Sequence, residues 1–151
     1  MDVRKVMSSD IVTIAPGETC HEALQRMTRN RVRHLPVVER DGAVVGIVTD
    51  RDLRHYLFTP DVFGRLGEVD VLSILRGARV RDIMSSPVVT TDANADVTDA
   101  VRVMCQRKVG SLPVLDGEEL VGILTETNLL REIVRADASA GPDVTIIVSY
   151  P

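Results

Sequence analysis

A threonine and an aspartate three positions apart are the residues whose types and spacing best suit binding chemistry. Thr49 and Asp52 follow an apolar run and open a helical pattern. A hydroxyl at a strand end and a carboxylate in the first helical turn can face one ligand, because a carboxylate accepts hydrogen bonds from two adjacent hydroxyls. An aspartate here also stabilises a helix N-terminus, so both roles stay open for Asp52, while Asp50 is expected to cap the helix.

The residue types that usually carry catalysis lack the necessary spacing. His21, His34 and His55 form no His-Glu-x-x-His pattern, and no acidic cluster completes a metal site. The serines lack a Gly-x-Ser-x-Gly elbow, and no Walker-type phosphate loop occurs. Cys20 and Cys105 lack Cys-x-x-Cys spacing and sit in helix-like stretches. We therefore expect no catalytic residue, no metal site and no disulfide.

The sequence contains an internal repeat, and the folded unit that it encodes must position these residues. Residues 3–9 recur as residues 80–86, an offset of 77 positions. After a hairpin signal the offset falls to 76, since residues 45–49 recur as residues 121–125. A turn is where a duplicated fold most easily loses a residue. The sequence therefore predicts two copies of one folded unit.

Each copy has the element order β-α-β-β-α, an α+β (α/β) unit. Apolar alternation and turn residues predict the strands, and apolar residues at helical spacing predict the helices. In the first copy we expect a strand over 11–14, a helix through Ala23 and Met27, strands over 35–39 and 44–49, and a helix over 50–57. We expect four segments: the first copy over 1–57, a linker with a short helix over 58–79, the second copy over 80–137 and a tail over 138–151 with a strand at 144–148.

Charge and hydropathy exclude several classes of partner. The net charge is -4, with 18 basic and 22 acidic side chains interleaved, so nothing indicates binding to nucleic acid. No apolar run approaches the roughly 20 residues that span a bilayer, and no signal-peptide stretch follows Met1. We expect a cytoplasmic protein that does not contact the membrane.

Two motifs, each present twice, resemble those of cystathionine beta-synthase (CBS) domains. The first copy carries Arg33-His34-Leu35-Pro36-Val37-Val38 and Gly46-Ile47-Val48-Thr49-Asp50-Arg51-Asp52. The second carries Gly110-Ser111-Leu112-Pro113-Val114-Leu115 and Gly122-Ile123-Leu124-Thr125-Glu126-Thr127-Asn128. The resemblance spans Val3 to about Val134. It implies a Bateman module, in which two CBS units pack about a pseudo-twofold axis and leave two clefts for adenosine ligands.

The resemblance also implies roles for particular residues. Ribose contacts are expected from Thr49 and Asp52 in the first copy and from Thr125 and Asn128 in the second. The other ligand-binding residues expected are Arg33 and His34 toward phosphate, Ser111 at the matching place in the second copy, and Thr13 and Thr90 at the ends of the first strands.

The second copy departs from the pattern. Asn128 replaces the aspartate and Gly110-Ser111 replaces the basic pair, leaving Lys108 or Arg107 as the nearest cations unless these are simply solvated. Charged hydrogen bonds contribute about 1.5–3 kcal/mol and neutral ones about 0.5–1.5 kcal/mol. The cleft of the first copy is therefore expected to bind a phosphorylated adenosine about tenfold more tightly.

The function implied is regulatory. We expect a non-enzymatic sensor of an adenine nucleotide (AMP, ADP or ATP) that acts on a protein partner in trans. The alternatives are an interaction scaffold with empty clefts, or a binder of S-adenosylmethionine or NAD. We also expect a homodimer through the closing helices of the two copies, which carry Leu53, Leu57, Leu129, Leu130, Ile133 and Val134.

Overall fold

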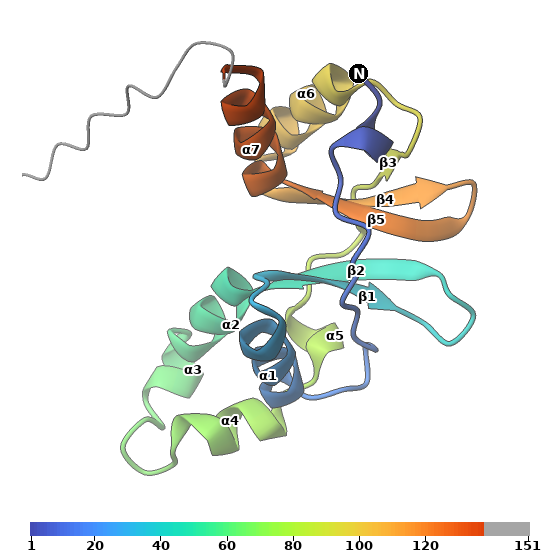
Figure 1. Ribbon diagram of the computed structural model, residues 1–151. Helices are drawn as coiled ribbons and strands as arrows, with labels where there is room; N and C mark the ends of the chain where they lie inside the picture. The colour runs from blue at the N-terminus through green and yellow to red at the C-terminus, as the bar shows by residue number, and fades with distance from the viewer. Residues whose placement is uncertain (138–151) are drawn as a thin grey trace, which may run out of the picture.

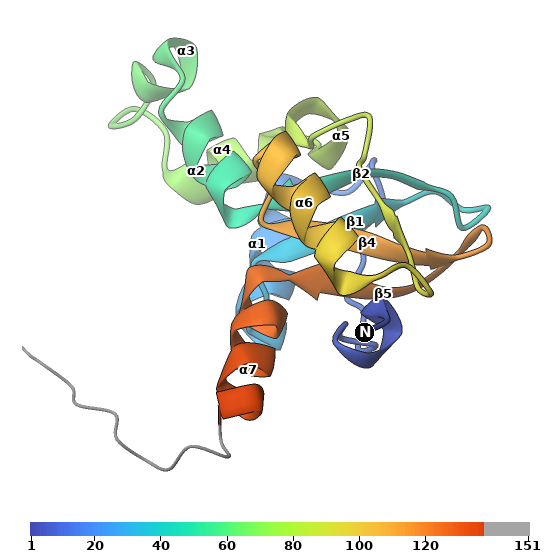
Figure 2. The same ribbon diagram turned by 90° about the horizontal axis from the view of Figure 1, so that it is seen from above.

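Two similar units, each built on an antiparallel hairpin, make up the protein in the computed structural model, which describes residues 1–137. The two hairpins lie beside each other in the middle of the molecule, with helices on the outer sides (Figure 1). Seen from above, the hairpin tips point the same way (Figure 2). The first unit uses β1 (His34–Val38), β2 (Val44–Thr49), α1 (Cys20–Asn30) and α2 (Asp50–Leu57), and the second uses β4 (Ser111–Asp116), β5 (Glu119–Thr125), α6 (Val97–Arg107) and α7 (Glu126–Asp137).

The hairpins confirm the predicted strand pairs and register them so that each strand end meets a helix start. His34 pairs with Thr49, and Ser111 pairs with Thr125. The predicted strand over 11–14 is wrong in extent, because only Ile14 forms a bridge, parallel to Val37. In the second unit the equivalent segment forms the short strand β3 (Thr91–Asp92), parallel to β4.

The first residues of each copy pack on the other copy's unit. The 3-10 helix η1 (Val3–Lys5) lies against the second unit, where the Val3 amide donates to the Ala95 carbonyl at 2.9 Å. Helix α5 (Val80–Ile83) lies against the first unit, where the Val80 amide donates to the Glu18 carbonyl at 2.9 Å. Both valines are fully buried in those cores. The two units are therefore interlocked, and packing does not follow sequence order.

Two glycines make this exchange possible. A Cβ at Gly46 would lie 2.6 Å from the Met84 sulfur and 3.0 Å from the Ser85 carbonyl oxygen. A Cβ at Gly122 would meet the Met7 sulfur and would lie 2.9 Å from the Ser8 carbonyl oxygen. These backbones also pair with the strands, since Ser85 bridges Ile47. Only glycine lets the crossing segments approach so closely.

The connection between the copies contains the short helices α3 (Pro60–Phe63) and α4 (Val71–Gly77). Asp70 caps α4, and Ile74 and Leu75 are buried. The strand expected at 144–148 lies outside the described residues. Among residues 1–137, no helix is both long enough and apolar enough to cross a bilayer.

The closing helices expose fewer apolar side chains than expected. Leu53 is buried in the first core, and Leu57 and Leu129 pack partly buried against the cores, so the expectation that Leu53 is available for a dimer interface is wrong. The side chains of α7 that remain open are Leu130, Ile133 and Val134, at 62%, 65% and 69% exposure.

Candidate functional site: two clefts between the units

Two clefts lie between the units, near the starts of β1 and β4. The larger cleft encloses about 700 Å³ and contains Thr49, Asp52 and Lys108. The smaller cleft encloses about 180 Å³ and contains Thr125, Asn128 and Arg31. These residues correspond pairwise through the sequence repeat. The two clefts are therefore related by pseudo-symmetry, and each is built from both copies.

Thr49 and Asp52 form a capping box at the start of α2. The Thr49 amide and hydroxyl donate to Asp52 Oδ2 at 2.8 and 3.0 Å, and the Asp52 amide donates to Thr49 Oγ1 at 3.2 Å. The expectation that Asp50 caps this helix is wrong, since Asp50 is its first helical residue and accepts from Arg54 at 3.1 Å. The hydrogen bonds of the described residues leave Asp52 Oδ1 unused, so one oxygen holds the helix while the other can accept from a ligand.

Thr125 and Asn128 repeat this geometry with a different outcome. Asn128 Oδ1 accepts from the Thr125 amide at 2.9 Å and from its hydroxyl at 2.6 Å. The oxygen must face the Thr125 amide, because that N–H needs an acceptor. The amide nitrogen of Asn128 is then left for a ligand. The larger cleft thus offers a charged acceptor where the smaller cleft offers a donor.

Arg33 and His34 line both clefts. Assigning this basic pair to the cleft of Thr49 and Asp52 alone is therefore wrong. By the repeat, Arg33 corresponds to Gly110 and His34 to Ser111, and only the larger cleft contains that second pair. The starts of β1 and β4 meet between the units, so a side chain from either start can reach across.

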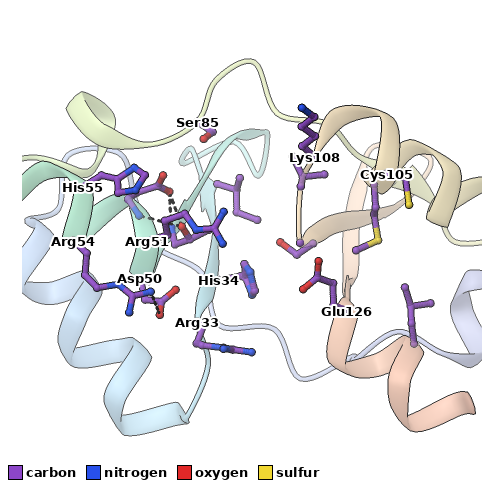
Figure 3. Close-up of a pocket in the computed structure, with 18 of the residues that line it drawn as sticks. Arg33, His34, Asp50, Arg51, Arg54, His55, Ser85, Cys105, Lys108 and Glu126 are labelled. Atoms are coloured by element: carbon purple, nitrogen blue, oxygen red, sulfur yellow. Dashed lines mark hydrogen bonds and ion pairs between the residues drawn. The ribbon is translucent and has the colours of Figure 1, made fainter. Parts of the chain in front are cut away.

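Each cleft also receives a cation from the C-terminal end of the other copy's first long helix. Arg31 ends α1 and Lys108 ends α6, both left-handed with φ of 53° and 54°. Lys108 lines the larger cleft together with Arg51 from the opposite unit, and both are labelled in Figure 3. Lys108 lines a cleft as the sequence predicts, whereas Arg31, Arg51 and Arg131 are cleft residues that were not predicted. Arg31 and Lys108 occupy equivalent positions in the sequence repeat, and this equivalence could have predicted that both line a cleft.

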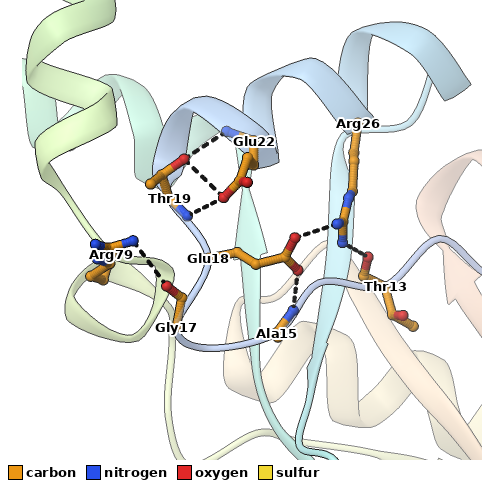
Figure 4. Close-up of polar contacts among 8 residues, drawn as sticks. All are labelled: Thr13, Ala15, Gly17, Glu18, Thr19, Glu22, Arg26 and Arg79. Carbon is orange, nitrogen blue, oxygen red and sulfur yellow. Dashed lines mark hydrogen bonds and ion pairs between the residues drawn. The ribbon is translucent and has the colours of Figure 1, made fainter.

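Thr13 and Thr90 are not brought to the clefts. Neither residue lines the larger or the smaller one, and Thr13 lies instead in a groove near the hairpin tips. The Thr13 carbonyl accepts from Arg26 Nη1 at 2.7 Å, and Arg26 also pairs with Glu18 (Figure 4). Glu18 in turn accepts from the Ala15 amide at 2.8 Å. This network holds the segment before α1 and occupies the Thr13 carbonyl.

His34 is half-buried at the boundary between the clefts. Burial lowers the pKa of His34 below its ordinary value, and the neighbouring Arg33 lowers it further. Asp50, Glu126 and Asp52 oppose this shift of the pKa. Since burial and Arg33 prevail, the imidazole is mainly neutral at pH 7.

The family model for the CBS domain matches residues 3–59 and again residues 80–135. A CBS domain-containing protein of Dictyostelium discoideum is 37% identical over 88% of this chain and 91% of its own length. CBS domain-containing protein YhcV of Bacillus subtilis is 30% identical over 96% of this chain and 94% of its own length. Other relatives are longer. Protein MJ1404 of Methanocaldococcus jannaschii is 33% identical over 95% of this chain, but the match covers only 34% of the length of MJ1404.

Solved structures show the same fold. Protein MJ1225 from Methanocaldococcus jannaschii superposes with a TM-score of 0.77 at 28% identity, over 87% of this chain and 47% of that one. CBSX2, solved in complex with AMP, superposes with a TM-score of 0.71 at 27% identity, over 90% of this chain and 98% of that one.

Proposed function

The chain belongs to the CBS domain family, and from that premise we propose that its CBS pair senses an adenosine-containing ligand, AMP, ADP or ATP, bound between the two units. The capping box of Thr49 and Asp52 carries this proposal, because it leaves one carboxylate oxygen unused on a residue that lines a cleft of about 700 Å³. That volume lies within the roughly 300 to 1,000 Å³ typical of small-molecule sites. The complex of its structural neighbour CBSX2 with AMP supports the choice of ligand.

The larger cleft suits the nucleoside best. Asp52 accepts from the ribose hydroxyls, while Lys108 and Arg51 supply positive charge for phosphate. The smaller cleft, of about 180 Å³, has arginines but no carboxylate at the position of Asn128. Tighter binding beside Asp52 therefore remains our expectation, now because of cleft volume and the free carboxylate oxygen rather than the basic pair.

The output of this module is a change of shape that a partner protein reads in trans. A ligand shifts a conformational equilibrium only by its differential affinity for the two states. A ligand that contacts both units at once has different affinities for the two states, because its contacts fit only one position of the first unit relative to the second. No catalytic step is proposed.

Thermal unfolding with and without ligands tests this function. A ligand bound only by the folded state stabilises it by about 2.7 kcal/mol at 100-fold excess over Kd. AMP, ADP and ATP should raise the Tm, while the guanosine equivalents serve as matched controls. A shift confined to S-adenosylmethionine or NAD would move the proposal to those ligands. Identical Tm values with every adenosine compound would leave an interaction scaffold with empty clefts.

A further inference from the structure

The two clefts share a wall made by Arg33 and His34 of the first copy and Glu126 of the second. His34 begins β1 and Glu126 begins α7, and both line the larger and the smaller cleft. Their side chains face each other across the boundary between the units in Figure 3. Whatever binds in one cleft is therefore next to groups that also face the other.

Gly110 lies beside both of these side chains. A Cβ at Gly110 would lie 3.5 Å from His34 Nε2 and 3.6 Å from Glu126 Oε1. The Glu126 amide donates to the Gly110 carbonyl at 3.1 Å, just as the Asp50 amide donates to the Arg33 carbonyl at 3.1 Å. The backbone thus holds both sides of the wall in fixed places.

The shared wall does not follow the pseudo-symmetry of the two copies, because its groups differ in charge or in pairing from those at the matching positions. Asp50, the counterpart of Glu126, is paired with Arg54. Leu130 stands where Arg54 does in the repeat, and no ion pair among residues 1–137 includes Glu126. His34 has the buried Ser111 as its counterpart, which cannot titrate. The two clefts therefore share the guanidinium of Arg33, the imidazole of His34 and the carboxylate of Glu126, and no ion pair among residues 1–137 includes any of the three.

We propose that His34 is a shared contact for anionic ligand groups in both clefts, so that filling one cleft changes the affinity of the other. This rests on the proposed function, because it requires a phosphate-bearing ligand. The charged and titratable groups that line the two clefts with the imidazole come from every adjoining element: Arg31 and Arg33 before β1, Asp50, Arg51, Asp52, Arg54 and His55 on α2, Glu126 and Arg131 on α7, Lys108 at the end of α6, and Asp10 before α1.

The sign of the coupling follows from proton linkage. The pKa of His34 lies below its ordinary value in the free protein, so the imidazole starts neutral at pH 7. A bound phosphate favours the charged form and raises this pKa, so binding takes up a proton and weakens as pH rises through the bound-state pKa. Each unit of that rise gives about tenfold tighter binding at low pH. A second anionic ligand then binds beside an imidazole that is already charged, so the first ligand raises the affinity for the second.

Calorimetric titration with AMP in buffers of different ionisation enthalpy measures the proton uptake. The AMP phosphate itself titrates near pH 6. The result therefore lies in the difference between wild type and His34→Gln, which keeps a hydrogen-bond donor but has no titrating ring. His21→Gln is the matched control, since His21 lies on α1 and lines neither cleft. Far-ultraviolet circular dichroism checks that the variants are folded.

We expect wild type and His21→Gln to take up more protons than His34→Gln, with the larger uptake on the first AMP bound and the smaller on the second. Equal uptake by all three proteins, or AMP binding in one cleft alone, overturns the shared role and leaves the proposed function standing. If AMP, ADP and ATP all fail to bind, the proposed function falls and takes this inference with it.

Discussion

Asp52 has two carboxylate oxygens with different tasks. Oδ2 closes the capping box with Thr49, and Oδ1 is left for a ligand. The spacing of Thr49 and Asp52 was enough to predict that the pair acts together, but it did not predict that capping and ligand binding are compatible. That answer depends on which oxygen faces the backbone, which only the three-dimensional structure shows.

Replacing Asp52 should separate the two tasks. Asn128 already caps α7 through its amide oxygen, so Asp52→Asn should keep the cap and change the free energy of unfolding by less than about 0.5 kcal/mol. Asp52→Ala removes the side-chain half of the capping box and leaves the Thr49 amide without its acceptor, which should cost about 1 kcal/mol. Urea denaturation of both variants measures the difference. If Asp52→Asn destabilises as much as Asp52→Ala, the capping box does not act as described.

The origin of the cations around the clefts could not be predicted from single residues. Arg33 and His34 are expected in the cleft of the first copy because they lie at the start of the Leu35-Pro36 strand, where the resemblance to CBS domains implies basic side chains toward phosphate. The structure shares them between both clefts, because β1 and β4 begin beside each other across the pseudo-twofold axis. Contacts between copies have no signature in the local sequence.

At the scale of elements, periodicity and turn residues predicted the two hairpins and the long helices of both copies. Alternating apolar residues around Arg40-Asp41-Gly42 and around Gly117 mark the hairpins clearly. The exchange of η1 and α5 was not predictable. Both segments share the pattern Val-Arg-x-x-Met-Ser-Ser, so nothing in either one says which unit it packs on. The run over 11–14 failed as a strand because only Ile14 finds a partner.

The exchanged segments depend on glycine in the second strand of each hairpin. Gly46→Ala should destabilise the protein by about 1–3 kcal/mol, because its Cβ would collide with the Met84 side chain and the Ser85 backbone. Gly77→Ala is the control, since nothing lies within 4 Å of a Cβ there and alanine suits a helix better than glycine. Chemical denaturation should show a loss only for Gly46→Ala. Equal stability of the two variants would contradict the close approach.

For the whole molecule, the exposed face of α7 supports the expected homodimer. Leu130, Ile133 and Val134 are each more than 60% exposed, and the stacked rings of Phe58 and Phe63 are exposed at the end of the first unit. Apolar faces of this kind commonly mark protein interfaces. Helices α2 and α7 occupy equivalent places in the two units. A second copy can therefore cover the apolar face of α7 and the phenylalanine rings that follow α2 with one twofold contact.

Charges on α7 should disrupt this association. Leu130→Lys combined with Ile133→Lys should give a monomer without unfolding, because both side chains are already exposed. Gln106→Lys, on the exposed side of α6, adds a charge away from that face and should leave the mass unchanged. Light scattering at micromolar concentration compares the three proteins. A monomeric wild type, or a dimer that survives the double substitution, would contradict the proposed interface.

We propose that an adenosine ligand binds between the two interlocked units with its ribose on Asp52. Calorimetric titration of wild type, Asp52→Asn and Asn128→Ala with AMP, ADP and ATP tests this proposal. We predict two unequal affinities in wild type, a loss of about tenfold or more at the tighter site in Asp52→Asn, and weakening of only the other site in Asn128→Ala. Tight binding that survives Asp52→Asn, or two equal sites in wild type, would contradict this account.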